Sequence, residues 1–208
     1  VRREGEIGPT KYAELILTSQ TWRGAPWRHQ LFLLMPSTAE NGGKHGLLYI
    51  TGGNWRDRLA HPPQGEPLPR EATIFAGLSE RLASPMAVLL HVPQQPLFGG
   101  KVEDQIISYT FEQYLRTGEK DWPLLLPMVK SAVRGMDAAA QYGKQKWSLD
   151  LQTFTVTGAS KRGWTTWLTG AVDSRVKAIA PMVIDVLNMG PQMEHQIRHW
   201  GNYSRQLH

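Results

Sequence analysis

The sequence predicts an α/β fold with a doubly wound, mostly parallel sheet covered by helices and an antiparallel hairpin at its N-terminal end. Two observations predict it. Apolar runs of strand length take turns with stretches of helical periodicity through the later half of the chain, whereas the earliest runs alternate in polarity. The 208 residues suit one domain with a sizeable core, so we expect a single domain over residues 1–208.

The first elements are a hairpin and a buried strand. Tyr12–Thr21 and Trp27–Met35 alternate moderately and are rich in β-favouring residues, and Arg23–Pro26 between them suits a turn. Gly46–Thr51 is apolar without alternation, which is typical of a strand buried on both faces. This strand is the first sign of a sheet with helices on both sides.

The rest of the chain alternates helices and strands. Helices are expected at Glu71–Ala83, Glu103–Arg116, Pro123–Lys144 and a stretch ending at Ala171, and strands at Met86–Val92, Gln152–Thr157 and Val176–Ile184. An amphipathic tail rich in His, Gln and Trp follows the last strand. Such alternation is what a doubly wound parallel sheet requires.

Composition excludes several classes of protein. Hydrophobic residues at 41% and charged residues at 20% are ordinary globular values. No apolar run approaches the roughly 18 residues that cross a bilayer, so no membrane span is expected. The net charge of +5 comes from scattered residues, which does not favour a nucleic-acid partner. The absence of cysteine excludes disulfides and thiolate metal sites, and neither a cofactor nor a metal is expected.

The segment Thr157–Gly163 (TGASKRG) carries the clearest chemical signal. A β-rich run, Gly158, Ser160 and a helical stretch follow one another, as at the nucleophile elbow of α/β-hydrolases, where a strained turn exposes a serine. The strict G-x-S-x-G pattern fails, because Arg162 stands where the second glycine belongs and Gly163 comes one residue later. We interpret Ser160 as the nucleophile; the alternative is a serine that only caps the helix.

Acyl transfer also needs donors for the developing oxyanion. The backbone N–H of Lys161, directly after the serine, is the first candidate. Thr51–Trp55 (TGGNW) follows a buried strand at the place where esterases carry a glycine-rich turn, so the N–H of Gly53 or Asn54 is the candidate second donor. The alternative is a glycine pair chosen for its conformation alone.

Longer stretches resemble a known family. Thr157–Trp167 and Val176–Asp185 closely resemble the PhoPQ-activated pathogenicity-related proteins, as do Leu17–Trp22, His195–Gln196 and Trp200–Ser204, so the similarity covers nearly the whole chain. The resemblance implies an α/β-hydrolase fold, commonly in exported proteins, with a poorly defined biochemical activity and some members described as secreted regulators of growth. It therefore implies a secreted or periplasmic protein.

The elbow is also similar to that of glucuronoyl esterases, where a basic residue after the serine helps to bind the oxyanion. This resemblance implies that the Lys161 side chain adds a charge beside its N–H. The alternative is an exposed surface lysine.

The catalytic acid and base are harder to place. In α/β-hydrolases both follow the serine in sequence. Asp185 ends the strand after the elbow and is the candidate acid, against a capping or structural role. His195 and His199, spaced i, i+4 without a metal-site pattern, and His208 are the histidines after Ser160, and we expect surface or packing roles for them.

The chain is expected to be part of a longer protein. Its first residues show neither an initiator methionine nor a signal peptide, which favours an internal start. The family resemblance implies further strands, one followed by an acid and the last by a histidine. We therefore expect the sheet to lack its last strands here and the triad to be completed beyond His208.

Two functions follow from these residues. The first is esterase-like hydrolysis of a small-molecule or carbohydrate ester through an acyl-enzyme on Ser160. The alternative is a secreted signalling or binding protein that keeps the fold without catalysis. Five tryptophans could line a carbohydrate pocket, although core packing suits most of them: Trp55, Trp122, Trp164, Trp167 and Trp200.

Overall fold

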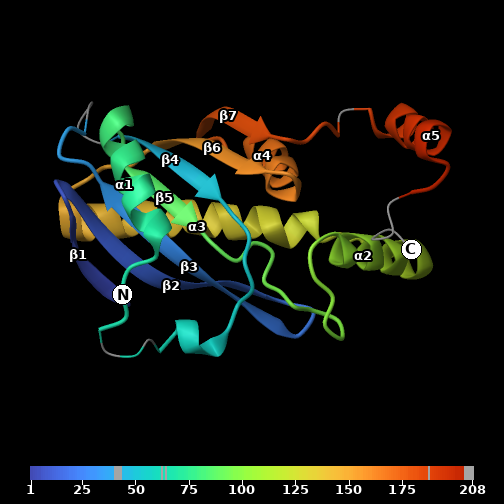
Figure 1. Ribbon diagram of the computed structural model, residues 1–208, viewed down its shortest axis with the longest axis horizontal. Helices are drawn as coiled ribbons and strands as arrows, with labels where there is room; N and C mark the ends of the chain where they lie inside the picture. Colours follow the sequence, from blue (N-terminus) through green and yellow to red (C-terminus); the bar gives the residue numbers. More distant parts are fainter. Residues whose placement is uncertain (40–43, 62, 64, 187, 204–208) are drawn as a thin grey trace.

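A computed structural model describes residues 1–39, 44–61, 63, 65–186 and 188–203; Ser204 and His208 of the sequence analysis lie outside the described residues. The described strands form one mixed sheet of seven, in the order β1-β2-β3-β5-β4-β6-β7 (Figure 1). The strands are β1 (Arg3–Ile7), β2 (Thr10–Trp22), β3 (Ala25–Met35), β4 (His45–Ile50), β5 (Met86–Leu89), β6 (Thr153–Ala159) and β7 (Val176–Met182). The helices are η2 (Asp57–Leu59), α1 (Arg70–Leu82), α2 (Asp104–Thr117), α3 (Leu125–Trp147), α4 (Lys161–Val172) and α5 (Met189–Trp200).

The N-terminal half of the sheet is antiparallel. Strands β2 and β3 form the predicted hairpin around a turn at Arg23 and Gly24, whose φ angles of 49° and 77° are left-handed. Strand β1, which was not predicted, pairs with β2, and β3 joins the rest of the sheet through antiparallel pairing with β5. The predicted N-terminal hairpin is therefore confirmed.

The other half of the sheet is parallel. Strands β5, β4, β6 and β7 run side by side in one direction, with Ile50 of β4 opposite Gly158 of β6. Because parallel strands end at the same edge, the residues after β4 and after β6 meet there. The predicted glycine turn and the predicted elbow are thus brought together by the register.

Helices cover both faces, as predicted (Figure 1). Side chains of successive strand residues point to opposite faces, so Leu31 and Leu33 lie in the core under α3 while Phe32 and Leu34 pack in the cluster with Ala76 of α1. Helix α4 contacts β6, β7 and α3. Apolar packing on both faces holds the central strands in place.

Several element boundaries differ from the prediction. The strand expected at Met86–Val92 stops at Leu89, because the chain turns at His91, whose φ is 63°. The strand expected to reach Ile184 ends at Met182, and the last helix begins only at Met189. Among the described residues, no helix combines the length and apolarity needed to cross a bilayer.

Candidate active site

Ser160 lies at a sharp turn between β6 and α4. Its φ of 56° and ψ of −127° put a non-glycine residue in a sparsely populated region, at a cost of about 1–3 kcal/mol. Two backbone bonds hold the turn: the Ser160 N–H donates to the Met182 carbonyl at 2.9 Å, and the Trp164 N–H donates to the Ser160 carbonyl at 3.0 Å. Ser160 is exposed and its side chain makes no capping hydrogen bond, so the helix-capping alternative is not what the structure shows.

Two glycines let β6, α4 and β7 approach closely at this turn. A Cβ on Gly158 would lie 2.9 Å from the Arg162 carbonyl oxygen, and a Cβ on Gly163 would lie 2.9 Å from that of Met182. Both contacts involve backbone and cannot relax by a rotamer change. Gly163 thus gives the close packing that the common pattern assigns to a glycine one position earlier, which accounts for the departure at Arg162.

The glycine turn after β4 lies against the elbow. A Cβ on Gly52 would fall 2.4 Å from Nη2 of Arg162, and one on Gly53, at φ 118°, would fall 2.8 Å from Nδ1 of His91. Space and conformation therefore both favour glycine at position 53, whereas a methyl group at position 52 would displace the Arg162 guanidinium. The His91 N–H donates to the Gly52 carbonyl at 3.0 Å and fixes the turn from the β5 side.

The side chains of Lys161 and Arg162 point into an ion-pair cluster that the sequence analysis missed. Arg162 binds both carboxylate oxygens of Glu103, at 2.7 and 2.8 Å, and donates through Nε to the Val92 carbonyl at 2.5 Å. Lys161 pairs with Glu103 and, at 2.7 Å, with Asp104. Lys161 is only 4% exposed, so the surface-lysine alternative is wrong.

The charge of Glu103 is firmly set. Partial burial alone would raise its pKa, but hydrogen bonds from Arg162 and Lys161 outweigh burial and lower the pKa to about 2. The two cations therefore face a permanent carboxylate near neutral pH. A sequence signal did exist, since the acidic pair Glu103–Asp104 mirrors the basic pair Lys161–Arg162, but 58 residues separate Glu103 from Lys161.

Among the described residues, neither the candidate acid Asp185 nor a histidine after Ser160 is hydrogen-bonded to the serine side chain. Asp185 is exposed and lies three residues past the end of β7. His195 and His199 lie on α5, outside the body of the sheet in Figure 1, with their rings stacked at 3.8 Å between centroids. Within the described residues, Ser160 Oγ has no hydrogen bond to a histidine, and no group of three or more potential ligands is arranged to hold a metal.

The tryptophans mostly pack, as expected. Trp55 meets the ring of His91 edge-on at 5.8 Å, Trp122 packs against Trp22 and Phe98, and Trp164 stacks on Phe111. Trp167 is partly buried, whereas Trp200 on α5 is 77% exposed.

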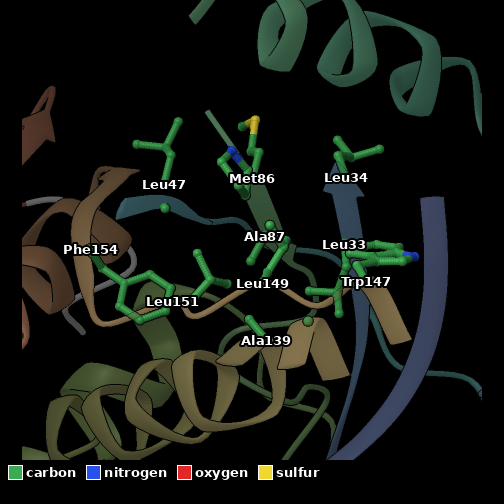
Figure 2. A pocket seen from close by; sticks show the side chains of 13 residues that line it. Leu33, Leu34, Leu47, Met86, Ala87, Ala139, Trp147, Leu149, Leu151 and Phe154 are labelled. Carbon is green, nitrogen blue, oxygen red and sulfur yellow. The ribbon is translucent and has the colours of Figure 1, made fainter. Parts of the chain in front are cut away.

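Several cavities lie near the sheet. Figure 2 shows a tight apolar one whose lining includes Leu47, Met86 and Trp147. Its volume is about 10 Å³, and it lies at the amino ends of β4 and β5, away from the elbow. A larger cavity of about 370 Å³ lies between α1 and the sheet and reaches Thr51 and Gly52. The larger cavity therefore borders the candidate site.

Comparison with known proteins assigns the family. The model of the PhoPQ-activated pathogenicity-related proteins matches residues 1–208. The chain belongs to this family. A Dictyostelium discoideum relative, named autocrine proliferation repressor protein A, is 34% identical over 201 residues, which are 91% of this chain and 39% of that protein. This member of the family thus spans well under half the length of that relative.

A solved structure shows the same fold. A proposed acetyl xylan esterase from Bacteroides fragilis superposes with a TM-score of 0.50 at 14% identity, over 85% of this chain and 46% of that one. This PhoPQ-related chain therefore has the α/β-hydrolase fold, with its N-terminal antiparallel strands, as the sequence predicted.

Proposed function

We propose that the protein is a serine hydrolase that cleaves esters through an acyl-enzyme on Ser160. The observation that carries the proposal is the backbone of this exposed serine, held at φ 56° and ψ −127° between a buried strand and a helix. Backbone strain of this kind persists only where the surrounding structure holds it in place, and strained residues cluster at active sites and ligand-binding sites. Here it presents the hydroxyl at the carboxyl edge of the parallel strands.

The reaction follows from these positions. Ser160 Oγ attacks the ester carbonyl carbon while its proton passes to a general base, and a tetrahedral oxyanion forms. The N–H of Lys161, in the first turn of α4, and the N–H of Gly53 or Asn54 stabilise that oxyanion. Its collapse breaks the bond to the alcohol, which leaves with the proton, and water then hydrolyses the acyl-enzyme.

The general base and the acid belong to the same proposal. No described histidine is hydrogen-bonded to Ser160, so we assign the base to a residue outside the described ones, with Asp185 as the alternative acid. The Dictyostelium relative has three fifths of its length outside the match, which leaves room for both. Residues 1–208 by themselves would then be nearly inactive.

The substrate is proposed to be an uncharged small-molecule or carbohydrate ester. Glu103 and Asp104 neutralise Lys161 and Arg162, so no free cation is offered to an anionic substrate by these two residues. This charge balance also argues against a direct role of the Lys161 side-chain charge at the oxyanion. A secreted or periplasmic location, suggested by the name of the family, is part of the proposal.

A second function is favoured by one specific observation. The Dictyostelium relative is named for repression of autocrine proliferation, which fits a secreted signalling protein that keeps the fold without using Ser160. The two functions differ in whether Ser160 is activated.

A fluorophosphonate probe tests the proposal in the full natural chain. We expect labelling that disappears in Ser160→Ala, because the probe reacts only with an activated serine. Residues 1–208 alone should label far more slowly. An intact, folded full chain that takes up no probe would favour the signalling function instead.

A further inference from the structure

Glu103 connects three segments that meet around the elbow. It stands just before α2, at φ 51° and ψ −127°, a strained conformation for a residue other than glycine. Its carboxylate takes a two-pronged bond from Arg162 and a further bond from Lys161, the two residues that follow the serine. A fork of this kind fixes the direction of the guanidinium as well as its place.

The same carboxylate is tied to the glycine turn by Gln95. The Gln95 amide donates to Glu103 Oε1 at 2.8 Å and to the Asn54 side-chain oxygen at 3.0 Å, while its own oxygen accepts from the Glu103 N–H at 2.8 Å. Gln95 is 3% exposed, so water does not compete for these bonds. A second route runs through Arg162, whose guanidinium lies against Gly52.

We propose that Glu103 is a positioning residue for the ester hydrolysis assigned to Ser160, holding the Gly52–Asn54 turn in register with the elbow. The inference rests on the proposed function, since the turn carries the second candidate oxyanion donor. An oxyanion hole works only if its donors are placed before the reaction. Glu103 supplies that placement without touching the substrate.

Two substitutions test separately the ion pairs of Glu103 and the hydrogen bonds of Gln95. Glu103→Gln keeps the size and removes the charge that orients Arg162 and Lys161. Gln95→Met keeps the length and the burial, leaves every charge in place and removes only the bonds to Glu103 and Asn54. Because Gln95→Met creates no unpaired charge, it carries the test if Glu103→Gln does not fold. The control is Glu112→Ala, which removes an exposed carboxylate from α2, the helix that follows Glu103.

The measurements are the fluorophosphonate labelling rate of the full natural chain and the kinetics of p-nitrophenyl acetate hydrolysis. We expect labelling and kcat to fall about tenfold or more in both variants with KM changed by less than about twofold, and Glu112→Ala to match the parent. A purely structural role would lower the melting temperature while leaving kcat per folded, titrated site unchanged.

The outcomes are distinct. If the parent labels at Ser160 and both variants keep kcat within about twofold of the parent, the positioning role is overturned while the proposed function stands. If the parent shows neither labelling nor hydrolysis, the proposed function fails and this inference fails with it.

Discussion

Ser160 and Glu103 hold nearly the same backbone conformation, at φ 56° and 51° with ψ −127° in both, each directly before a helix. Neither side chain makes a capping hydrogen bond to the helix that follows it, so each is available for other contacts. For Glu103 the target is the pair Lys161 and Arg162; for Ser160 none of the described residues accepts its hydroxyl. The strained conformation of Glu103 is therefore accompanied by ion pairs, whereas that of Ser160 leaves its hydroxyl without a described acceptor.

The buried side chain of His29 makes the stability of the folded protein depend on pH. It is fully buried, and burial lowers its pKa from 6.5 to about 4. Its Nδ1 lies 3.0 Å from the His91 carbonyl and therefore donates, so Nε2 accepts from the Ser19 hydroxyl at 2.9 Å. The ring is neutral in the folded protein at neutral pH.

The two pKa values of His29, about 4 in the folded protein and 6.5 in the unfolded chain, determine whether acid stabilises or destabilises the fold. Between about pH 6.5 and pH 4 the unfolded chain takes up a proton on His29 that the folded protein refuses, so stability is full above pH 6.5 and falls on acidification. The loss should reach about 3 kcal/mol. Urea unfolding across this range should show it in the parent and in the exposed-residue control His61→Gln, but much less in His29→Gln. Parallel pH profiles in all three would contradict the assignment.

At the scale of elements, the junction of β6, α4 and β7 depends on Gly163. An added methyl there would press on the carbonyl oxygens of Met182 and Gly158, at 2.9 and 3.0 Å. We expect Gly163→Ala to destabilise the protein by about 1–3 kcal/mol, as overpacking does. Gly77→Ala is the matched control, since Gly77 also lies in a helix but has nothing within 4 Å of its added methyl.

The control should be neutral or stabilising by up to about 1 kcal/mol, because alanine favours helix. The urea concentrations at the unfolding midpoints of Gly163→Ala and Gly77→Ala test this difference in stability. Equal midpoints would mean that the close approach of α4 to β7 does not hold in solution.

The elements themselves were largely predictable from periodicity, whereas their meeting points were not. The hairpin, the buried run of β4 and the helix after Ser160 each have a local signature. The early end of β5 was missed, because the left-handed conformation of His91 has no signal in a non-glycine residue. Strand β1 was missed because its side chains are mostly polar and exposed.

For the whole molecule, the candidate site is assembled from segments far apart in the sequence. The elbow and the glycine turn could be predicted, because each has its own motif and both follow parallel strands. The cluster of Glu103 with Lys161 and Arg162 could not, because its acidic and basic pairs are visible in the sequence but nothing there indicates that they meet across 58 residues. The sequence thus predicted the two candidate segments, and the structure shows the contacts that hold them together.

Family membership extends over the whole chain, while the Dictyostelium relative is matched over only 39% of its length. The fold shared with a proposed acetyl xylan esterase shows the arrangement of helices and strands but does not show which reaction, if any, the protein catalyses. What distinguishes a working hydrolase from a signalling protein on the same frame is the reactivity of one hydroxyl.

The most direct measurement is therefore the mass of the peptide that contains Ser160 after rapid acid quenching of the full natural chain with p-nitrophenyl acetate. If Ser160 is the nucleophile, an acetyl group is added to Ser160 within the first turnover and is lost as product appears. Turnover without an acetyl on Ser160, or no acetyl and no turnover in a folded chain, would mean that Ser160 is not the nucleophile.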